Sequence, residues 1–200
     1  RQFAEEHLRE SHRESVRIRM RHARHYLSTM KNLGGALLSY QQVQTLDLLE
    51  PDFDNIRSAW LNAAEAGEIE LKEQAVIPLF FFLDIQSRFH EGAEVFRMAG
   101  DKLAARRKPA VGDPAPEDPG SRLQALIRVC RGWFIRHADP EQAGRLLDGS
   151  ASILRAGGMD SFSAFAEALR VYYGFEQDPE RIAAVLETCL AACRSSGEAW

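Results

Sequence analysis

Apolar residues recur at helical spacing along almost the whole chain, and few windows alternate between apolar and polar positions. Long stretches rich in Ala, Leu, Glu and Arg also favour helix. Gly34-Gly35 is expected to end the first helix, and Gly67 the third. The pattern predicts an all-α protein whose first half has helices at about Phe3–Met30, Ala36–Leu49, Pro51–Ala66, Glu68–Arg88 and Glu91–Arg107.

The segment "AVIPLFFFLDI", residues 75–85, is apolar nearly all round, so it is expected to be the buried centre of the first half. Pro78 removes a backbone donor inside this segment and predicts a kink or a break. Phe80, Phe81 and Phe82 are compatible with a ligand pocket. At helical spacing in an apolar segment, however, they more often belong to the core.

The second half repeats itself, because Asp139-Pro140-Glu141 returns as Asp178-Pro179-Glu180 at an interval of 39 residues. The apolar stripes of two helices return at the same interval, which predicts helix–turn–helix units at 121–157 and 160–196. Both Cys189 and Cys193 fall on the predicted core stripe, where a free cysteine behaves as a small hydrophobic residue.

The repeated motif "DPE" has two carboxylates at the start of an apolar run, which is compatible with either an acid/base pair or a helix start. Asp139 is well placed as an N-cap, and Pro140 suits the first helical position, where its missing N–H costs nothing. Gln142 is placed to reach back as in a capping box. An acid/base pair would have to lie in a cleft that shifts the pKa of one carboxyl group, and nothing in the adjoining sequence indicates one. The helix-start interpretation is therefore favoured.

The composition is that of an ordinary globular protein, with 45% hydrophobic and 27% charged residues and a net charge of -4. That charge gives no overall attraction to nucleic acid or to anionic membrane. No apolar stretch approaches the roughly 20 residues of a membrane span. Three cysteines without framework spacing indicate a reducing compartment, so a cytoplasmic location is expected. The Pro/Gly-rich residues 108–120 predict a linker between a helical arm, residues 1–107, and the repeats, residues 121–200.

Residues with chemical potential do not assemble into a catalytic or metal-binding pattern in the sequence. His22 and His25, with His7 and His12 earlier, lack further ligands at zinc spacing. The basic stretch Arg9–Arg24 is expected to be a solvated helix face. No phosphate-binding loop and no ordered Ser/His/Asp set is present in these residues. We therefore expect no cofactor, no metal and no catalysis by these residues, and the binding residues stay unassigned.

The repeat pairs resemble tetratricopeptide-like repeats, in which a small residue, here Ala143, lets the second helix approach the first. This resemblance implies antiparallel helix pairs stacked as a right-handed superhelix. A second resemblance spans the whole chain, through "RQFAEEHL", "RMRHARHYLSTM", "LDLLEPDFDNIRSAW" and "FFFLDIQSRFHEGAEVF". These phrases resemble the helical arm of STAND-class regulatory ATPases, which include LuxR-type and antibiotic-regulator-type transcription factors and cyclase-linked ATPases. The sharpest match is Asp54-Asn55-Ile56-Arg57 followed by Ala59-Trp60.

That resemblance implies a sensor or protein-interaction arm that follows a winged-helix segment and an upstream nucleotide-binding module. Its partner would be a protein or a small-molecule inducer on the repeat surface, with no direct contact to nucleic acid or membrane. Two alternatives stay open: a free-standing tetratricopeptide-like adaptor that binds a peptide, and an enzyme with a pocket around the aromatic helix. By the 39-residue interval a third unit begins at Trp200, which predicts an exposed apolar edge around Val185 and Cys189 and self-association through it.

Overall fold

The computed structural model describes residues 2–106, 118–172, 174 and 177–196, and the described residues contain helices and no strands. Side chains are described for 14–106, 118–172, 174, 177–191 and 194. The chain forms two compact units, Arg1–Leu79 and Phe80–Trp200, and the division falls inside helix α4, Ile69–Ile85. The predicted linker lies outside the described residues except for 118–120, which begin helix α6, Pro119–Ile135.

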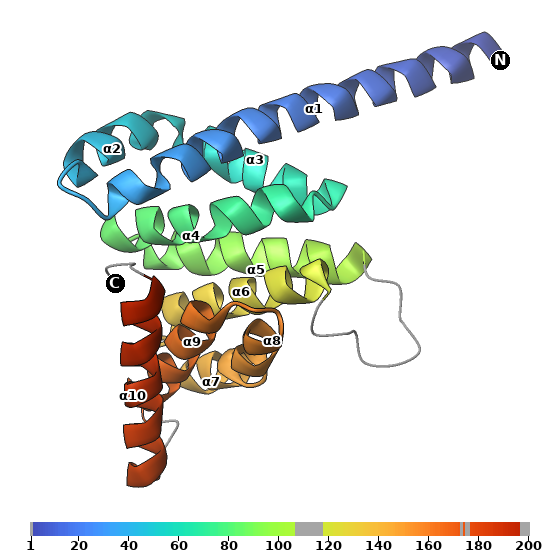
Figure 1. The fold of residues 1–200 in the computed structure, drawn as a ribbon. Coiled ribbons are helices and arrows are strands. Elements are labelled where there is room, and N and C mark those ends of the chain that lie inside the picture. The colour runs from blue at the N-terminus through green and yellow to red at the C-terminus, as the bar shows by residue number, and fades with distance from the viewer. Residues whose placement is uncertain (1, 107–117, 173, 175–176, 197–200) are drawn as a thin grey trace. The chain divides into compact units, whose positions relative to one another are not determined.

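The first unit is built on α1, Gln2–Leu37, which packs against α2, Gln42–Leu49, and α3, Phe53–Ala66 (Figure 1). A short 3-10 turn, η1, Glu50–Asp52, joins α2 to α3. Side chains spaced three or four residues apart on both helices form the core, which is the amphipathic pattern expected of packed helices. The buried members are Ala23, Leu27, Met30 and Leu37 of α1 and Phe53, Ile56, Ala59, Trp60, Ala63 and Ala64 of α3.

The prediction that Gly34-Gly35 ends the first helix is wrong, because α1 continues through both glycines to Leu37. The reason is tertiary. A Cβ atom built on Gly34 would lie 2.6 Å from Cγ of Pro78, so Gly34 permits close packing between α1 and α4. The predicted helix at 36–49 is correspondingly shorter, and begins at Gln42. Gly67 does end α3 as predicted, with φ of 78° and its N–H bonded to the carbonyls of Ala63 and Ala64.

Helix α4 runs through Pro78 without a break, contrary to one of the two predicted outcomes at that residue. The segment is buried as expected, and its apolar side chains turned inward are Ala75, Val76, Leu79, Phe80, Phe82 and Leu83. Lys72 is also fully buried, and its Nζ lies 3.6 Å from the centre of the Trp60 ring. The ring and the carbonyl of Trp60, 3.4 Å from Nζ, stabilise the charged head in this position.

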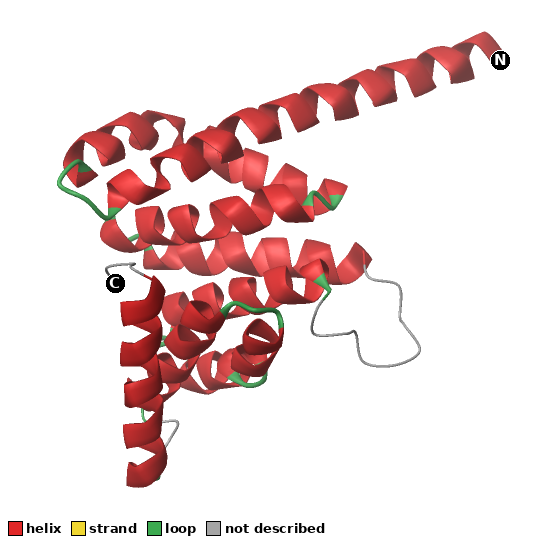
Figure 2. Ribbon diagram, in the orientation of Figure 1, coloured by secondary structure: helices red, strands yellow, loops and turns green. Residues whose placement is uncertain are grey.

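The second unit contains the end of α4, then α5, Phe89–Arg106, and α6, which pack against each other. Beyond α6 lie α7, Pro140–Leu147; α8, Ser150–Ala156; α9, Asp160–Tyr172; and α10, Pro179–Ser196 (Figures 1 and 2). Helix α6 contacts α7 and α8, and α9 contacts both α8 and α10. Neighbours in sequence are therefore neighbours in space, as in a helical array.

Phe80 and Phe82 of "FFF" belong to the core of this unit, whereas Phe81 is half-buried. The ring centre of Phe80 lies 5.5 Å from that of Phe134 and 6.0 Å from that of Phe165. Phe134 in turn stacks on Phe96 at 5.9 Å. Offset and tilted ring pairs at such distances are the favoured packing of aromatic side chains. The rings of Phe80, Phe96, Phe134 and Phe165 thus pack on one another in this cluster.

The two sequence repeats differ in the course of their second helix. In the first copy the second helix is divided into α7 and α8 at Asp148-Gly149, where Gly149 has φ of 74°. The second copy has Glu187-Thr188 at the equivalent place, and α10 continues through it. Glycine adopts this left-handed conformation without the steric cost of a Cβ atom, which explains why the division occurs in one copy.

Candidate functional site

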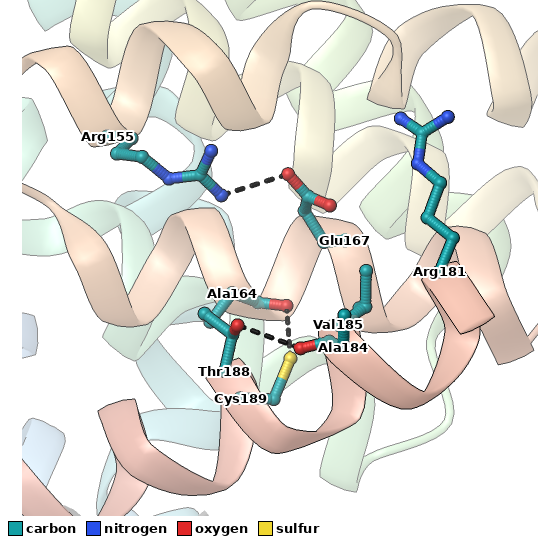
Figure 3. A pocket seen from close by; sticks show the side chains of 8 residues that line it. All are labelled: Arg155, Ala164, Glu167, Arg181, Ala184, Val185, Thr188 and Cys189. Carbon is teal, nitrogen blue, oxygen red and sulfur yellow. Dashed lines mark hydrogen bonds and ion pairs between the residues drawn. The ribbon is translucent and has the colours of Figure 1, made fainter.

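A groove between α8, α9 and α10 has a volume of about 270 Å³ and combines apolar with charged side chains (Figure 3). We call it the α9–α10 groove. Its position follows from the sequence repeat, because α9 and α10 are the first and second helices of the second copy. The lining residues are Arg155, Ala164, Glu167, Arg181, Ala184, Val185, Thr188 and Cys189.

Small and apolar side chains form one part of the α9–α10 groove. Ala164 of α9 is buried, Val185 of α10 is half-buried, and Ala184 is exposed beside it. On a helix, residues 181, 184, 185 and 188 lie on one face, because they are three or four positions apart. The small side chain of Ala184 is what leaves space on that face.

Charged groups border the groove. Arg155 donates a hydrogen bond from Nη2 to Oε1 of Glu167 at 3.0 Å, across from α8 to α9. The Arg155 side chain is 54% exposed and that of Glu167 is 23% exposed, so solvent screens the pair and it contributes little to stability. Figure 3 draws Glu167 between Arg155 and Arg181, which is exposed on α10. Two guanidinium groups and one carboxylate thus give this border a positive balance.

Two hydrogen bonds complete the wall formed by α10. Thr188 donates from its hydroxyl to the carbonyl of Ala184 at 2.8 Å, and Cys189 donates from Sγ to the carbonyl of Ala164 at 3.0 Å (Figure 3). The prediction that Cys189 lies in the core is only partly correct, since it is half-buried and lines the groove. The reason is that α10 packs on α9 along one side. The side chain of Cys193 lies outside the described residues.

The apolar stripe predicted for α10 is more exposed than its counterpart in the first copy. Leu147 of α7 is 1% exposed, whereas its equivalent, Leu186, is 46% exposed. Leu190 is 56% exposed, while Val185 and Cys189 are half-buried. The predicted apolar edge of the last pair is therefore present, but its exposed members are Leu186 and Leu190.

The carboxylates of the first "DPE" do not form an acid/base site. Asp139 is the N-cap of α7 and accepts a hydrogen bond from the backbone N–H of Gln142 at 2.9 Å, as predicted. Glu141 points to Arg145 on the exposed side, at 3.6 Å. The predicted capping box does not form, because the amide oxygen of Gln142 instead accepts from Nη2 of Arg131 at 3.1 Å. Asp178 caps the second copy through the N–H of Glu180.

The histidines considered for metal binding pack on an aromatic ring. The centres of the His22 and His25 rings lie 4.7 Å and 4.9 Å from that of Tyr26. The side chains of His7 and His12 lie outside the described residues. In the part of the chain with described side chains, no three His, Cys, Asp or Glu residues converge as metal ligands. From the basic stretch, Arg24 reaches Glu68 at 3.5 Å.

A second groove, of about 460 Å³, was not foreseen from the sequence. It lies between the first turns of α5 and the end of α6, and we call it the α5–α6 groove. Its lining comes from segments some 40 residues apart, so no local sequence motif predicts it. The lining residues are Phe89, His90, Ala93, Glu94, Arg97, Arg131, Phe134, Ile135, His137 and Ala138.

The two grooves differ in size relative to known binding sites. Small-molecule pockets usually have volumes of about 300–1,000 Å³. The α9–α10 groove, at about 270 Å³, is smaller than this range and suits one side chain of a larger partner.

No described helix is both long and apolar enough to cross a membrane. No protein-family model, curated protein or solved structure matches the chain.

Proposed function

We propose that this chain is a non-catalytic helical-repeat interaction arm, which binds a segment of a protein partner in the α9–α10 groove. The observation that carries the proposal is the composition of that groove. It joins space for one apolar side chain, beside Ala164, Ala184 and Val185, to a charged border. Interfaces typically place an anchor side chain in a well-packed pocket and surround it with polar contacts.

The charged border indicates what kind of segment fits. Glu167 is bonded to Arg155, and the side chain of Arg181 is exposed on α10. A segment with a small or medium apolar residue next to a carboxylate would place the apolar side chain over Ala184 and the acid near the guanidinium groups. Charge complementarity of this kind gives specificity and speeds association more than it raises affinity.

The same proposal includes tetratricopeptide-like packing of the helix pairs. It is supported at the crossing of α6 and α7, where both helices present small residues. Ala143 is fully buried, and a Cβ atom built on Gly132 would lie 3.5 Å from its carbonyl oxygen. Helices approach each other closely where side chains at the crossing are small. The division at Gly149 makes the first copy an irregular member of such an array.

We further propose that the arm belongs to a bacterial STAND-class signalling ATPase that regulates transcription. This part rests on the sequence phrase Asp54–Trp60, in which Ile56 and Trp60 are buried and Asn55 and Arg57 are exposed. Partner binding would bias the upstream nucleotide-binding module between two states, which requires different affinity for those states. The gene upstream of the Arg1 codon should then encode a phosphate-binding loop, and its absence would favour the free-standing adaptor.

The binding proposal is tested with neighbouring alanines of α10. Peptides selected on the full chain from a random display library are titrated by fluorescence anisotropy. Ala184→Phe fills the α9–α10 groove, whereas Ala183→Phe places the same ring on an exposed position that does not line it. We expect Ala184→Phe to weaken binding about tenfold or more and Ala183→Phe to leave it unchanged, by analogy with the loss of a buried anchor. Equal effects of the two variants would reject the groove as the binding site.

A further inference from the structure

We propose that the α5–α6 groove is a separate binding site for a small organic acid with an aromatic or branched aliphatic body. This site shares no lining residue with the α9–α10 groove. The volume of the α5–α6 groove, its apolar floor and the hydrogen-bonding state of its charged residues indicate this class of ligand.

The volume suits a small molecule. At about 460 Å³ it lies within the usual range for small-ligand pockets, of about 300–1,000 Å³. The groove is closed on one side by α5 and on the other by the end of α6 and the residues that follow it. His137 and Ala138, on the connection to α7, complete the lining.

An aromatic floor makes the base of the groove apolar and rigid. Phe134 is 6% exposed and stacks on Phe96, while the ring of Phe89 lies 6.2 Å from it. Gly92 allows this arrangement, because a Cβ atom there would lie 2.8 Å from atoms of the Phe134 ring. Ala93, one position further along α5, leaves the space above the floor open. Such a surface favours a flat or branched apolar body.

Two of the charged residues of the groove, Glu94 and Arg97, are bonded to each other. Arg97 holds both oxygens of Glu94, at 2.6 Å and 2.8 Å, and also binds Asp101 at 2.7 Å. This bidentate bond to Arg97 lowers the pKa of Glu94 against the opposing effect of burial, and Arg97, His90 and Arg131 lower it further through their charge. Arg97 thus largely neutralises the charge of Glu94, which reduces the attraction of the groove for a cationic ligand.

Arg131, unlike Glu94, makes no hydrogen bond to a residue of opposite charge among the described residues. It donates from Nη2 to the neutral amide oxygen of Gln142 at 3.1 Å, and its Nε is buried without a hydrogen-bond partner among the described residues. Protein atoms enclose Nε, so a ligand in the groove would contact the Nη groups, and only Nη2 makes a hydrogen bond among the described residues. A carboxylate matches the planar donor geometry of a guanidinium group better than a neutral acceptor does. Arg131 is therefore the residue that we assign to the acid group.

The test compares an acid with its neutral analogue. The full chain, labelled with ¹⁵N, is titrated with 3-phenylpropionate and separately with 3-phenylpropanamide, and the Nε–H signals of arginine are followed by NMR. We expect the acid to shift the Arg131 signal and to bind about tenfold or more tightly than the amide, as for a hydrogen bond to a charged group. Equal affinity for the two compounds, or no shift with either up to their solubility limits, would overturn the proposal.

Three substitutions locate the site. Arg131→Gln is expected to lower the affinity for the acid to that for the amide, whereas Arg128→Gln, on an exposed position of the same helix, should leave it unchanged. Ala93→Leu fills the groove without removing a charge and should abolish binding of both compounds. Circular dichroism confirms that each variant is folded. Should Arg131→Gln unfold the protein, unchanged binding by the folded Ala93→Leu variant would still reject the site.

Discussion

The neighbouring glycines Gly34 and Gly35 provide a matched pair of substitutions, because both lie within α1 but only one faces another helix. A Cβ atom on Gly34 would lie 2.6 Å from Cγ and 3.2 Å from Cβ of Pro78, whereas a Cβ atom on Gly35 meets nothing within 4 Å. The proline ring is bonded to the backbone of α4, so it cannot swing aside as a flexible side chain would. Relief of the contact in Gly34→Ala requires one of the helices to shift.

The expected magnitudes follow from two opposing effects. Replacing glycine by alanine inside an exposed helix stabilises a protein by about 1 kcal/mol, and this gain applies to both positions. Overpacking costs about 1–3 kcal/mol, and it applies to Gly34 alone. We expect Gly35→Ala to raise the free energy of unfolding by about 1 kcal/mol. The difference between the two variants then measures the contact with Pro78, about 1–3 kcal/mol.

The assay is guanidinium denaturation followed by circular dichroism and, in a Trp133→Phe/Trp200→Phe background, by the fluorescence of Trp60, which is buried in the same compact unit. Midpoints are compared at equal slope, so that a shift reports stability. Two results would contradict this description of α1. If Gly34→Ala is as stable as Gly35→Ala, the helices do not meet closely at Pro78. If Gly35→Ala is destabilising, the helix ends at the glycine pair, as the sequence alone predicted.

Three further predictions concern the second unit. Asp139→Ala is expected to lower the free energy of unfolding by about 1 kcal/mol through loss of the α7 cap, and Asp139→Asn should be near neutral; a calorimetric melt distinguishes them. Burial raises the pKa of the Cys130 thiol well above its usual range. Iodoacetamide should therefore alkylate Cys189 before Cys130 in the native protein, and equal alkylation rates by mass spectrometry would contradict this. Self-association through the exposed edge should be reduced in the double variant Leu186→Glu/Leu190→Glu by sedimentation velocity, and a wild-type chain that stays monomeric at high concentration would refute that edge as an interface.

Helix starts and stops were predictable from the sequence where a single residue decides them. Asp139 acts as an N-cap because its side chain reaches the N–H of Gln142 within the same turn. Gly67 ends α3 because it adopts a left-handed conformation that other residues adopt at a cost. Both effects are local, so the sequence around each residue contains all the information that is needed. The apolar stripes of α1 and α3 were predictable for the same reason.

Features that depend on a distant partner were not predictable. The continuation of α1 through Gly34 depends on Pro78, which the sequence places more than 40 residues away. The side chain of Gln142 bonds Arg131 instead of the backbone, because folding brings α6 beside α7. The α5–α6 groove depends on the register between two helices, and neither helix carries a motif for it. Only the packed structure relates Arg131 to Glu94 and Phe89.

Helix α6 lies in one proposed site and contacts two helices of the other, and this makes a thermodynamic link between the sites testable. Helix α6 provides Arg131 and Phe134 to the α5–α6 groove and packs against α8 and α9, which help to form the α9–α10 groove. A small acid that binds Arg131 affects the partner site only if it favours one arrangement of these helices over another. By linkage, peptide binding must then change the affinity for the acid by the same factor. Peptide titrations with and without 3-phenylpropionate, and acid titrations with and without peptide, measure that factor twice. A factor other than one establishes that the two sites are coupled, whereas a factor of one in both directions shows that the arm carries two independent sites.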